Sequence, residues 1–515
     1  MQNEVALDFL LEGFIDDTLI EQCRGITINA LVQDNRKARS GDLFIAHQGY
    51  NTHGLLYAQD AVAKGVSVVL WDGDVGFNND RRREILDSIS NKVLCIQCEN
   101  LKYKVGPIAS RYYEQPSLSL NTIGVTGTDG KTSVSHFLAQ CLDAHDVHCG
   151  VLGTLGNGFI NDLHPTGLTT VDALLVQKTL ADIQRACAKH VVMEVSSHGL
   201  DQGRVNGVAF TTAVFTNMGK DHLDYHGTVD NYGAAKKRLF CTPGLGTAVI
   251  NLDDEFGRKL AKEVREHVCV WGYSLKADVS VYKEYADYFV NVLEMKPFDR
   301  GYHLSVVTPK GSGHFDSPLL GRFNVANALS VLATLLVSQF SFDEAVKSLS
   351  AIRSVDGRVE IITEDDKPVV VVDYAHTEQG LTAICQLAGE HFNGDVWCVF
   401  GCGGDRDRSK RPLMAKAAEK YADRIIVTTD NPRHENPQDI IDEVLTGFSS
   451  LENVEAVLDR RQAIDIAITN AQPGDVVLLA GKGHETSQIV GDVHIAFDDR
   501  RIARELLSAR ECGVL

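Results

Sequence analysis

The stretch "GVTGTDGKTS", residues 124–133, has the composition of a phosphate-binding loop but not the commonest spacing. A Walker A loop needs a glycine five positions before its Gly-Lys-Thr tail, and Val125 stands at that position. The groups that bind a phosphate are nevertheless present. Small residues let backbone N–H groups approach a phosphate, Lys131 supplies a positive charge, and Thr132 offers a hydroxyl for Mg²⁺. Taken alone, the stretch is also compatible with a Gly/Thr-rich surface turn.

The residues on either side of this loop favour the phosphate-binding interpretation. Residues 120–127, "LNTIGVTG", predict a buried strand, and residues 134–145 carry apolar side chains at helical spacing. A strand, a glycine-rich loop and a helix in this order are typical of a nucleotide-binding α/β domain. The fold class that we expect is therefore α/β.

Length and composition limit the classes of protein to be considered. A chain of 515 residues predicts two to four domains of about 150 residues each, and we expect three. Hydrophobic residues at 44% and charged residues at 23% indicate a folded, soluble protein. The net charge of −19 argues against a nucleic-acid or membrane-surface partner, although local arginines and helix N-termini can still hold an anionic ligand.

Targeting signals and cysteine usage favour the cytoplasm. The N-terminus lacks a basic region followed by a long apolar core, and no run approaches about 18 apolar residues. The 12 cysteines are scattered through strand-like and helix-like stretches, which suits reduced thiols better than a disulfide framework. Cys95 and Cys98 form a CxxC pair without a second pair or a histidine cluster nearby, so we expect two core thiols, with a metal or redox site as the alternative.

The order of strand-like and helix-like runs predicts three domains, at residues 1–106, 107–352 and 353–515. The first alternates strand-like runs at 42–49, 67–72 and 92–97 with a helical stretch at 54–65. The second opens near the phosphate loop and continues with buried-strand runs at 190–197, 211–217 and 247–254, which predict a mostly parallel sheet. The third repeats this pattern at 368–376, 395–408, 424–433 and 475–485, which predicts another doubly wound domain.

Each strand-like run of the third domain ends abruptly in Gly, Asp, His, Arg or Asn. The carboxyl ends of parallel strands meet at one edge of a sheet, where open α/β sheets bind their ligands. The endings therefore predict a binding site.

Two further stretches bring candidate catalytic residues. Glu194 follows a buried-strand run directly, where its carboxylate is suited to Mg²⁺, although a solvated strand end is the alternative. His222 follows another strand-like run, and Lys236 lies on a predicted helix, where a solvated surface lysine is the ordinary expectation.

Ten strings occur in an order that resembles the Mur ligase family and span nearly the whole chain. They are "GVTGTDGKTS", "MEVSSHGLDQGR", "TNMGKDHLDYHG", "NYGAAK", "LLGRFNVANAL", "DGRVE", "VDYAHT", "GCGGDRDRSKRP", "TTDNPR" and "GKGHE". The resemblance implies a uridine-substrate-binding first domain, a central ATP-binding domain of the P-loop type, and a Rossmann-like third domain that binds an amino acid. It also implies that ATP activates a carboxylate as an acyl phosphate, which an incoming amine converts to an amide.

The resemblance assigns catalytic, metal and nucleotide roles residue by residue. The implied catalytic residues are Lys131, Glu194, His222 and Lys236. The implied ligands are Thr132 and Glu194 for a first Mg²⁺, with His222 and a carbamylated Lys236 (N6-carboxylysine) for a second. Lys236 matches the family pattern better than Lys237 because it follows "AA" in "YGAAK". The ATP contacts are implied to be Gly127, Thr128, Asp129, Gly130, Lys131, Thr132, Ser133, Asn324, Asn327, Arg358 and His376.

The acceptor contacts follow from two other strings. The resemblance implies that Thr169, Thr170, Ser196, Gln202 and Arg204 bind the UDP-N-acetylmuramoyl-L-alanyl-D-glutamate acceptor. Arg204 could pair with an acidic part of it, and a surface arginine is the alternative. In the first domain, residues 34–44 resemble the uridine-binding segment, with Asn35 where the family usually has serine, and "GYNTHG" at 49–54 is a weaker match.

The third substrate is implied to be meso-diaminopimelate, which differs from L-lysine by one carboxylate at its far end. Arg433 of "DNPR" can form a bidentate pair with that carboxylate. Lysine would leave this arginine unpaired, at a cost of roughly 2–5 kcal/mol. The implied contacts are Arg406, Asp430, Asn431, Pro432, Arg433, Gly481 and Glu485, with Glu485 as the partner of an ammonium group. Without the other motifs, residues 428–437 would be taken as an ordinary loop.

Competing functions remain at this point. Asp129 stands where asparagine is usual, and "YAHTEQGL" stands where Thr-Pro often follows the histidine. The alternatives are a ligase for L-lysine or another acceptor, a folylpolyglutamate synthetase, and a nucleotide-binding scaffold without turnover.

We expect a monomer that uses small-molecule substrates and does not insert into a membrane.

Overall fold

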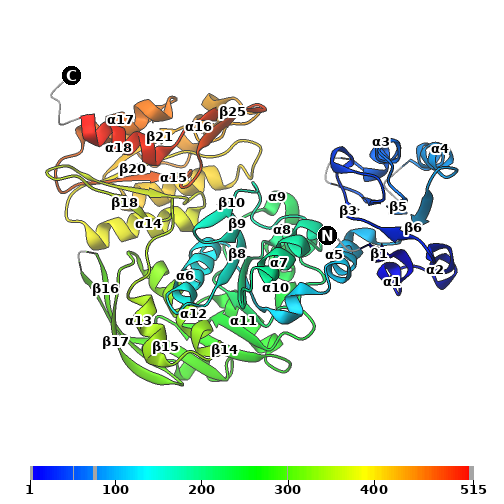
Figure 1. The fold of residues 1–515 in the computed structure, drawn as a ribbon. Coiled ribbons are helices and arrows are strands. Elements are labelled where there is room, and N and C mark those ends of the chain that lie inside the picture. The colour runs from blue at the N-terminus through cyan, green and yellow to red at the C-terminus, as the bar shows by residue number, and fades with distance from the viewer. Residues whose placement is uncertain (1–3, 50–51, 74–77, 299, 510–515) are drawn as a thin grey trace. The chain divides into compact units, whose positions relative to one another are not determined.

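The computed structural model describes residues 4–49, 52–73, 78–298 and 300–509. The chain divides into two compact units. Unit 1 comprises residues 1–124, 147–211 and 242–245, and unit 2 comprises residues 125–146, 212–241 and 246–515. The three domain ranges expected from the sequence stay a prediction. Figure 1 shows the elements of both units.

The described strands of unit 1 form an antiparallel pair, β1-β2, and two larger sets. Its helices are α1 (Leu7–Leu11), α2 (Asp17–Cys23), η1 (Asn35–Lys37), η2 (Gly54–Tyr57), α3 (Ala58–Ala63), α4 (Asn79–Ile89), α5 (Leu101–Tyr112), η3 (Pro116–Ser119), α7 (Ala173–Arg185) and α8 (Ser197–Asp201). Its strands are β1 (Val5–Ala6), β2 (Thr27–Ile28), β3 (Leu31–Val32), β4 (Leu43–Ala46), β5 (Val68–Trp71), β6 (Leu94–Gln97), β8 (Cys149–Gly153), β9 (Gly156–Phe159), β10 (Asp162–His164) and β11 (His190–Glu194). Strand β7 (Asn121–Thr126) crosses the boundary between the units.

The first set of strands in unit 1 is a parallel sheet in the order β3-β4-β5-β6. Its residues alternate between two apolar clusters: Leu43 and Ile45 pack with α1 and α5, whereas Phe44 and Ala46 pack with α3 and α4. A sheet that is buried on both faces requires the near-continuous apolar runs that the sequence has here. The second set follows the order β10-β9-β8-β11-β7, with β8 and β11 parallel.

Unit 2 contains the helix after the phosphate loop and the whole C-terminal sheet. Its helices are α6 (Lys131–Asp143), α9 (Leu223–His226), α10 (Val229–Phe240), α11 (Glu255–Val264), η4 (Ser280–Tyr282), α12 (Arg322–Val337), α13 (Phe342–Leu349), α14 (Glu378–His391), α15 (Lys410–Tyr421), α16 (Pro437–Leu445), α17 (Arg460–Asn470) and α18 (Asp499–Ala509). Its strands are β12 (Thr212–Phe215), β13 (Thr247–Asn251), β14 (Cys269–Ser274), β15 (Tyr288–Phe298), β16 (Gly301–Thr308), β17 (Gly311–Ser317), β18 (Glu360–Ile362), β19 (Val369–Asp373), β20 (Val396–Phe400), β21 (Arg424–Thr428), β22 (Val454–Val457), β23 (Val476–Ala480), β24 (Ser487–Val490) and β25 (Val493–Ala496). From β7 the strands continue in the order β12-β13-β14-β15-β16-β17, with parallel pairing from β12 to β15 and antiparallel pairing from β15 to β17.

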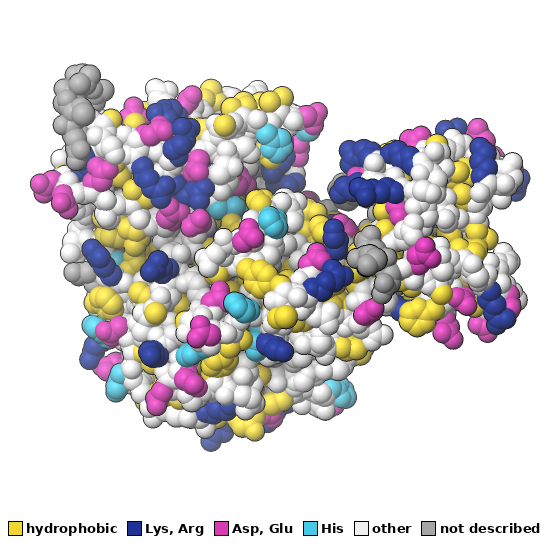
Figure 2. All heavy atoms as spheres, in the orientation of Figure 1, with side chains coloured by type: hydrophobic (Ala, Val, Ile, Leu, Met, Phe, Trp, Pro, Cys, Tyr) yellow, Lys and Arg dark blue, Asp and Glu magenta, His cyan; other side chains and the backbone are white. Residues whose placement is uncertain are grey.

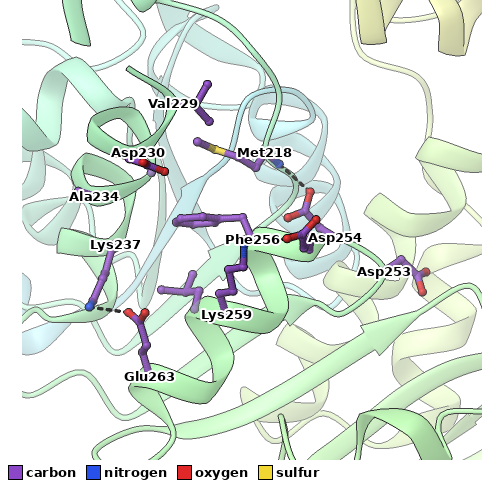
Figure 3. Close-up of a pocket in the computed structure, with 13 residues that line it drawn as sticks. Met218, Val229, Asp230, Ala234, Lys237, Asp253, Asp254, Phe256, Lys259 and Glu263 are labelled. Atoms are coloured by element: carbon purple, nitrogen blue, oxygen red, sulfur yellow. Dashed lines mark hydrogen bonds and ion pairs between the residues drawn. The ribbon is translucent and has the colours of Figure 1, made fainter. Parts of the chain in front are cut away.

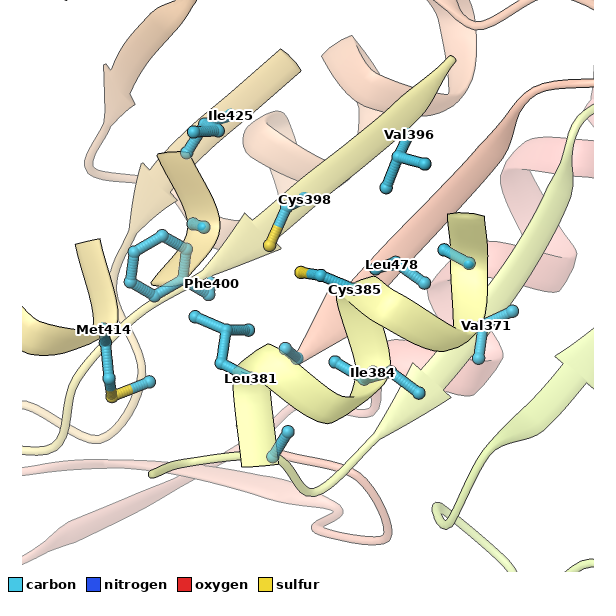
Figure 4. Packing of buried hydrophobic residues seen from close by; sticks show 14 of the residues in the cluster. Val371, Leu381, Ile384, Cys385, Val396, Cys398, Phe400, Met414, Ile425 and Leu478 are labelled. Carbon is cyan, nitrogen blue, oxygen red and sulfur yellow. The ribbon is translucent and has the colours of Figure 1, made fainter. Parts of the chain in front are cut away.

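The C-terminal sheet has the order β18-β19-β23-β20-β21-β22 and is parallel except for β18. Successive residues of its strands face opposite clusters: Val371 and Leu478 pack against α14 and α15, whereas Val372 and Leu479 pack against α17 and α18. Figure 4 shows the first of these clusters between the strands and α14. The doubly wound domain expected from the sequence is confirmed.

Figure 2 shows acidic and basic side chains interspersed over most of the visible face, with several basic side chains gathered on one side of the N-terminal part. No helix among the described residues is long and apolar enough to span a bilayer.

Candidate functional site

The phosphate-loop candidate connects β7 to α6, as the sequence predicts. Gly127 has φ +154°, and a Cβ there would lie 1.8 Å from Thr216 Oγ1. Gly130 has φ +84°, and a Cβ there would lie 2.7 Å from Asn327 Oδ1. Both positions therefore require glycine, because a side chain would displace the loop from its neighbours. The surface-turn alternative is wrong for this stretch.

Lys131, the first residue of α6, folds back over the loop. Its Nζ donates to the carbonyl oxygens of Gly127 (3.0 Å) and Thr128 (2.7 Å). On the next residue, Thr132 Oγ1 accepts from Arg358 Nη2 at 3.2 Å. Arg358 therefore contacts the first turn of α6 within unit 2, and its contact with ATP stays a prediction.

Lys236 lies inside the protein rather than on its surface. Its side chain is 1% exposed, and its Nζ donates to Gly127 O at 2.6 Å. Burial lowers its pKa well below the usual value, the charge of Lys131 acts in the same direction, and Asp221 and Asp129 act against them. The neighbouring Lys237 is exposed and pairs with Glu263 at 2.5 Å. The surface-lysine expectation is thus wrong, and Lys236 rather than Lys237 faces the loop.

Tyr232, one helical turn before Lys236, is a residue that the sequence reasoning missed. Lys236 Nζ lies 4.1 Å from the centroid of its ring, and its hydroxyl lies 3.2 Å from Thr128 Oγ1. The ring of His222 is 6.2 Å away from that of Tyr232. The sequence held a signal for this contact, because Tyr232 and Lys236 are four residues apart on a predicted helix and therefore lie on the same face.

Asp221 connects two predicted histidines and was also missed. Its Oδ2 lies 3.4 Å from His222 Nε2 and 3.7 Å from His376 Nε2. Burial raises the pKa of Asp221, but the interactions with His376 and His222 and the charge of Lys410 outweigh burial and hold that pKa well below its usual range. The carboxylate is therefore ionised, and it orients both imidazoles. His222 itself has a left-handed backbone, with φ +55°, at the start of α9.

Glu194 ends β11 in unit 1 and is 1% exposed, so the solvated alternative is wrong. Its Oε1 accepts from Thr154 N at 2.8 Å, and its Oε2 accepts from Thr154 Oγ1 at 3.0 Å. A Cβ on Gly153 would lie 2.2 Å from Oε1. The backbone is therefore shaped around a buried carboxylate, a group that suits Mg²⁺.

The predicted acceptor contacts surround Glu194 in unit 1. Thr170 Oγ1 donates to Glu194 O and accepts from Ser196 N, and Thr169 Oγ1 lies 3.1 Å from Thr154 Oγ1. Arg204 is half-buried and donates to Gln202 Oε1 and to Thr170 O. These five predicted residues (Thr169, Thr170, Ser196, Gln202, Arg204) are therefore brought together.

Asn35 is the remaining predicted acceptor contact. It begins η1 and donates to Asp60 Oδ2 at 3.3 Å. Within "GYNTHG", residues 50 and 51 lie outside the described residues.

The predicted nucleotide contacts outside the phosphate loop lie on α12 and in two connecting segments of unit 2. Asn324 and Asn327 are buried on α12, where Asn327 Nδ2 donates to Asn324 Oδ1 at 3.2 Å. The guanidinium of Arg358 lies 4.5 Å from the ring centroid of Tyr374, and His376 Nδ1 lies 2.7 Å from Tyr374 O. Tyr374 is thus a shared support for two predicted contacts.

The carboxyl edge of the C-terminal sheet collects the predicted amino-acid contacts. Asn431 Nδ2 donates to Glu485 Oε2 at 2.8 Å, and a Cβ on Gly481 would lie 2.7 Å from Asp430 Oδ2. Arg433 is half-buried with φ +51°, an uncommon backbone for a non-glycine residue, and its Nη1 donates to Gly404 O at 2.8 Å. Residues 428–437 therefore include a loop that is held by contacts with Gly404 and Glu485, and its binding role stays a prediction.

Arg406 and Pro432 complete the predicted set at this edge. Arg406 Nη1 donates to Asp405 O, and Pro432 O lies within 2 Å of a Cβ built on Gly404. Burial lowers the pKa of Arg433, as does the charge of Arg406, whereas Asp430, Glu485 and Asp405 oppose this. Two neighbouring guanidinium groups favour an anionic ligand at this edge.

Buried cations behind this edge were missed by the sequence reasoning. Arg460 is fully buried and pairs with Asp499 at 2.7 Å, Arg411 pairs with Glu435 and Glu443, and Lys482 pairs with Glu485. The sequence places each of these cations in a helix or a motif, but it does not show with which carboxylate the cation forms an ion pair in the folded chain.

A separate pocket, with a volume of about 680 Å³, is lined mainly by residues of α10 and α11. Figure 3 shows Phe256 and Met218 inside it and the Lys237–Glu263 ion pair at its margin. None of the predicted site residues lines it.

The metal or redox alternative for the CxxC pair finds no support. Cys98 Sγ contacts Phe14 O, and burial raises the pKa of Cys98 to about 11. The described residues contain no cluster of three or more potential metal ligands among His, Cys, Asp and Glu.

Comparison with known protein families covers most of the chain. Residues 27–113 match the Mur ligase family catalytic domain, residues 125–335 the Mur ligase middle domain, and residues 357–483 the Mur ligase glutamate ligase domain.

Individual relatives agree with these matches. The chain is 42% identical over 482 residues to the UDP-N-acetylmuramoyl-L-alanyl-D-glutamate--2,6-diaminopimelate ligase of Coxiella burnetii, covering 94% of this chain and 96% of that one. It is 44% identical over 489 residues to the ligase of the same name from Ectopseudomonas mendocina, covering 95% and 97%. A solved structure of a ligase of that name superposes with a TM-score of 0.67 and 34% identity, covering 99% of this chain and 100% of that one. The chain therefore belongs to the Mur ligase family.

Proposed function

We propose that this chain is an ATP-dependent ligase that joins meso-2,6-diaminopimelate to the D-glutamate side chain of UDP-N-acetylmuramoyl-L-alanyl-D-glutamate. The observation that carries the proposal is the polar cluster at the carboxyl edge of the C-terminal sheet. Arg433 offers a cation and Glu485 a carboxylate, each linked to Asn431. The far end of diaminopimelate is a zwitterion, and a zwitterion needs both signs of charge.

Selection against L-lysine follows from the arginine. L-lysine has no carboxylate at its far end. Binding of L-lysine would therefore remove water from the guanidinium group of Arg433 without supplying another hydrogen-bond partner. An unpaired charge of this kind costs roughly 2–5 kcal/mol, which is enough for strong discrimination. This argument disfavours a lysine-adding ligase, which is the nearest alternative within the family.

The loop of unit 2 supports carboxylate activation. The glutamate side-chain oxygen attacks the γ-phosphorus, and ADP leaves. The amine of diaminopimelate then attacks the acyl carbon, phosphate leaves, and the nitrogen loses a proton to give the amide. Lys131, now on the carbonyl oxygens of Gly127 and Thr128, is placed to move onto phosphate oxygens and stabilise their charge.

Two Mg²⁺ ions are part of the proposal. Bound Mg²⁺ would neutralise charge on the phosphoryl groups. Thr132 and Glu194 are the proposed ligands of the first ion, with His222 and carbamylated Lys236 as those of the second. Carbamylation requires a neutral amine, and the buried Lys236 has a lowered pKa. The modification would also convert the buried amine into an anionic oxygen ligand.

The remaining contacts are proposed on the family pattern. Gly127, Thr128, Asp129, Gly130, Ser133, Asn324, Asn327, Arg358 and His376 would bind ATP, and Asn35, Thr169, Thr170, Ser196, Gln202 and Arg204 the acceptor. Arg406, Asp430, Asn431, Pro432, Arg433, Gly481 and Glu485 would bind diaminopimelate. We place the protein in the cytoplasm as a monomer, in the synthesis of peptidoglycan precursors.

The test is ADP formation by the purified chain with Mg²⁺-ATP and the muramoyl dipeptide, comparing meso-diaminopimelate with L-lysine. Omitting each substrate in turn measures background hydrolysis. Turnover that requires both the dipeptide and diaminopimelate is the expected result. Equal turnover with lysine would contradict the role of Arg433, and no turnover with any combination would favour a nucleotide-binding relative without ligase activity.

A further inference from the structure

Lys482 lies between two glycines immediately after β23, and its side chain is 0% exposed. Its Nζ donates to Glu485 Oε2 (2.9 Å), Asn431 Oδ1 (3.1 Å) and Ser487 O (2.8 Å). An ammonium group has three donors, so these three bonds use all of them. Lys482 therefore has no donor left for a substrate and would act through its partners.

The bonds around Glu485 meet at one of its two oxygens. Oε2 accepts from Lys482 Nζ and from Asn431 Nδ2 at 2.8 Å. Among the residues that the structure describes, no hydrogen-bond donor reaches Oε1. The side chain of Glu485 is 27% exposed. One oxygen is thus held from behind, and the other remains an acceptor for a ligand.

The same contacts determine the orientation of the Asn431 amide. Its Oδ1 accepts from Lys482 Nζ and from Ile489 N at 3.0 Å, which leaves Nδ2 to donate to Glu485. Ile489 O in turn accepts from Arg433 N at 3.0 Å. Lys482 is therefore connected to the residue proposed for the ammonium group and, through β24, to the residue proposed for the carboxylate.

We infer that Lys482 is a positioning residue for diaminopimelate: it fixes Glu485 so that Oε1 receives the ammonium group at the far end of this substrate. The inference rests on the proposed function. A purely structural role, in which Lys482 only holds the β23–β24 connection, is the competing explanation. The two explanations differ in whether the effect depends on that far ammonium group.

The experiment compares Lys482→Met with the wild type on two amino acids. One is meso-diaminopimelate, and the other is L-2-aminopimelate, which keeps the reacting amine and the far carboxylate but lacks the far amine. We expect kcat/KM for diaminopimelate to fall about 10- to 100-fold, mostly through KM, as for loss of hydrogen bonds to a charged group. For L-2-aminopimelate, assayed as substrate or as competitive inhibitor, we expect a change of less than about threefold, since nothing binds Oε1.

A double-mutant cycle adds a second readout. On a Glu485→Gln background, Lys482→Met should have little further effect on KM for diaminopimelate, because both changes remove the same interaction. Lys482→Gln, which retains a donor without the charge, replaces Lys482→Met if the latter does not fold as judged by circular dichroism.

The outcomes separate the inference from the proposed function. Absence of wild-type turnover with diaminopimelate overturns the proposed function and the inference together. Given wild-type turnover, an equal loss for both amino acids, or additive effects in the cycle, overturns the inference alone and leaves a structural lysine. An unchanged KM for diaminopimelate also overturns it.

Discussion

Replacing His484 with glutamine should make unit 2 less sensitive to acid. His484 packs against Tyr374, with ring centroids 5.0 Å apart, and its Nδ1 is buried without a hydrogen-bond partner among the described residues. Burial lowers the pKa of His484 to about 3, and the charges of Arg358, Arg500 and Lys482 act in the same direction. The imidazole is therefore neutral in the folded protein near neutral pH.

The size of the effect follows from the two pKa values. The folded-state pKa lies below the ordinary value of about 6.5, so the unfolded chain takes up the proton first as the pH falls. The stability that depends on neutral His484 is complete above about pH 6.5 and is lost as the pH falls from there towards 3. Between pH 8 and pH 5 the loss is about 2 kcal/mol for this group.

The assay is urea unfolding at pH 8 and pH 5, monitored by tryptophan fluorescence, since Trp271 and Trp397 both lie in unit 2. His484→Gln has no imidazole to protonate, so it should lose about 2 kcal/mol less than the wild type between these pH values. His314→Gln, at an exposed position on β17, is the matched control and should behave as the wild type does. Equal acid sensitivity of His484→Gln and the wild type would refute the reasoning.

Three further changes test the site. Arg433→Lys should reduce the preference for diaminopimelate over L-lysine at least about 30-fold in kcat/KM, because an ammonium cannot make the bidentate pair; an unchanged ratio contradicts the assignment. Lys236→Ala should abolish ligation and remove a carbamate signal in ¹³C NMR with labelled bicarbonate. The control variant Lys237→Ala changes only the ion pair with Glu263 and should retain both the activity and the signal. Ligation by the Lys236→Ala variant would speak against the carbamate. Gly127→Ala should abolish ATP binding in calorimetry, because its Cβ would lie 1.8 Å from Thr216 Oγ1. Gly474→Ala, with φ +97° and open space, is the control for backbone strain alone, and similar ATP affinity in both variants would be the contrary result.

Much of the fold is readable along the chain. The runs at 368–376, 395–408, 424–433 and 475–485 became β19, β20, β21 and β23, because short apolar runs buried on both faces carry the signal for parallel strands. The polar endings also lie together, since parallel strands bring their carboxyl ends to one edge. The grouping of Asn431, Arg433 and Glu485 at that edge was therefore predictable.

Other properties of the site depend on contacts that no local pattern encodes. Lys236 and Lys237 are adjacent and chemically identical, yet one is buried against Gly127 O and the other pairs with Glu263 at the surface. Family resemblance chose between them, whereas helical spacing alone left Lys236 as a surface residue. Asp221, Tyr232 and Lys482 were overlooked because their partners lie far away in the sequence or were assigned to another role.

The sequence by itself determined which segments form strands and helices, where the glycine-rich loop lies, and which polar residues follow the strands. These depend on side-chain periodicity and backbone preference, which act over a few residues. Only the tertiary structure decided which polar group meets which: Asp221 between His222 and His376, and Lys482 behind Glu485. Burial and charge pairing depend on distance in space, and they set the ionisation and orientation of these groups once the chain is folded.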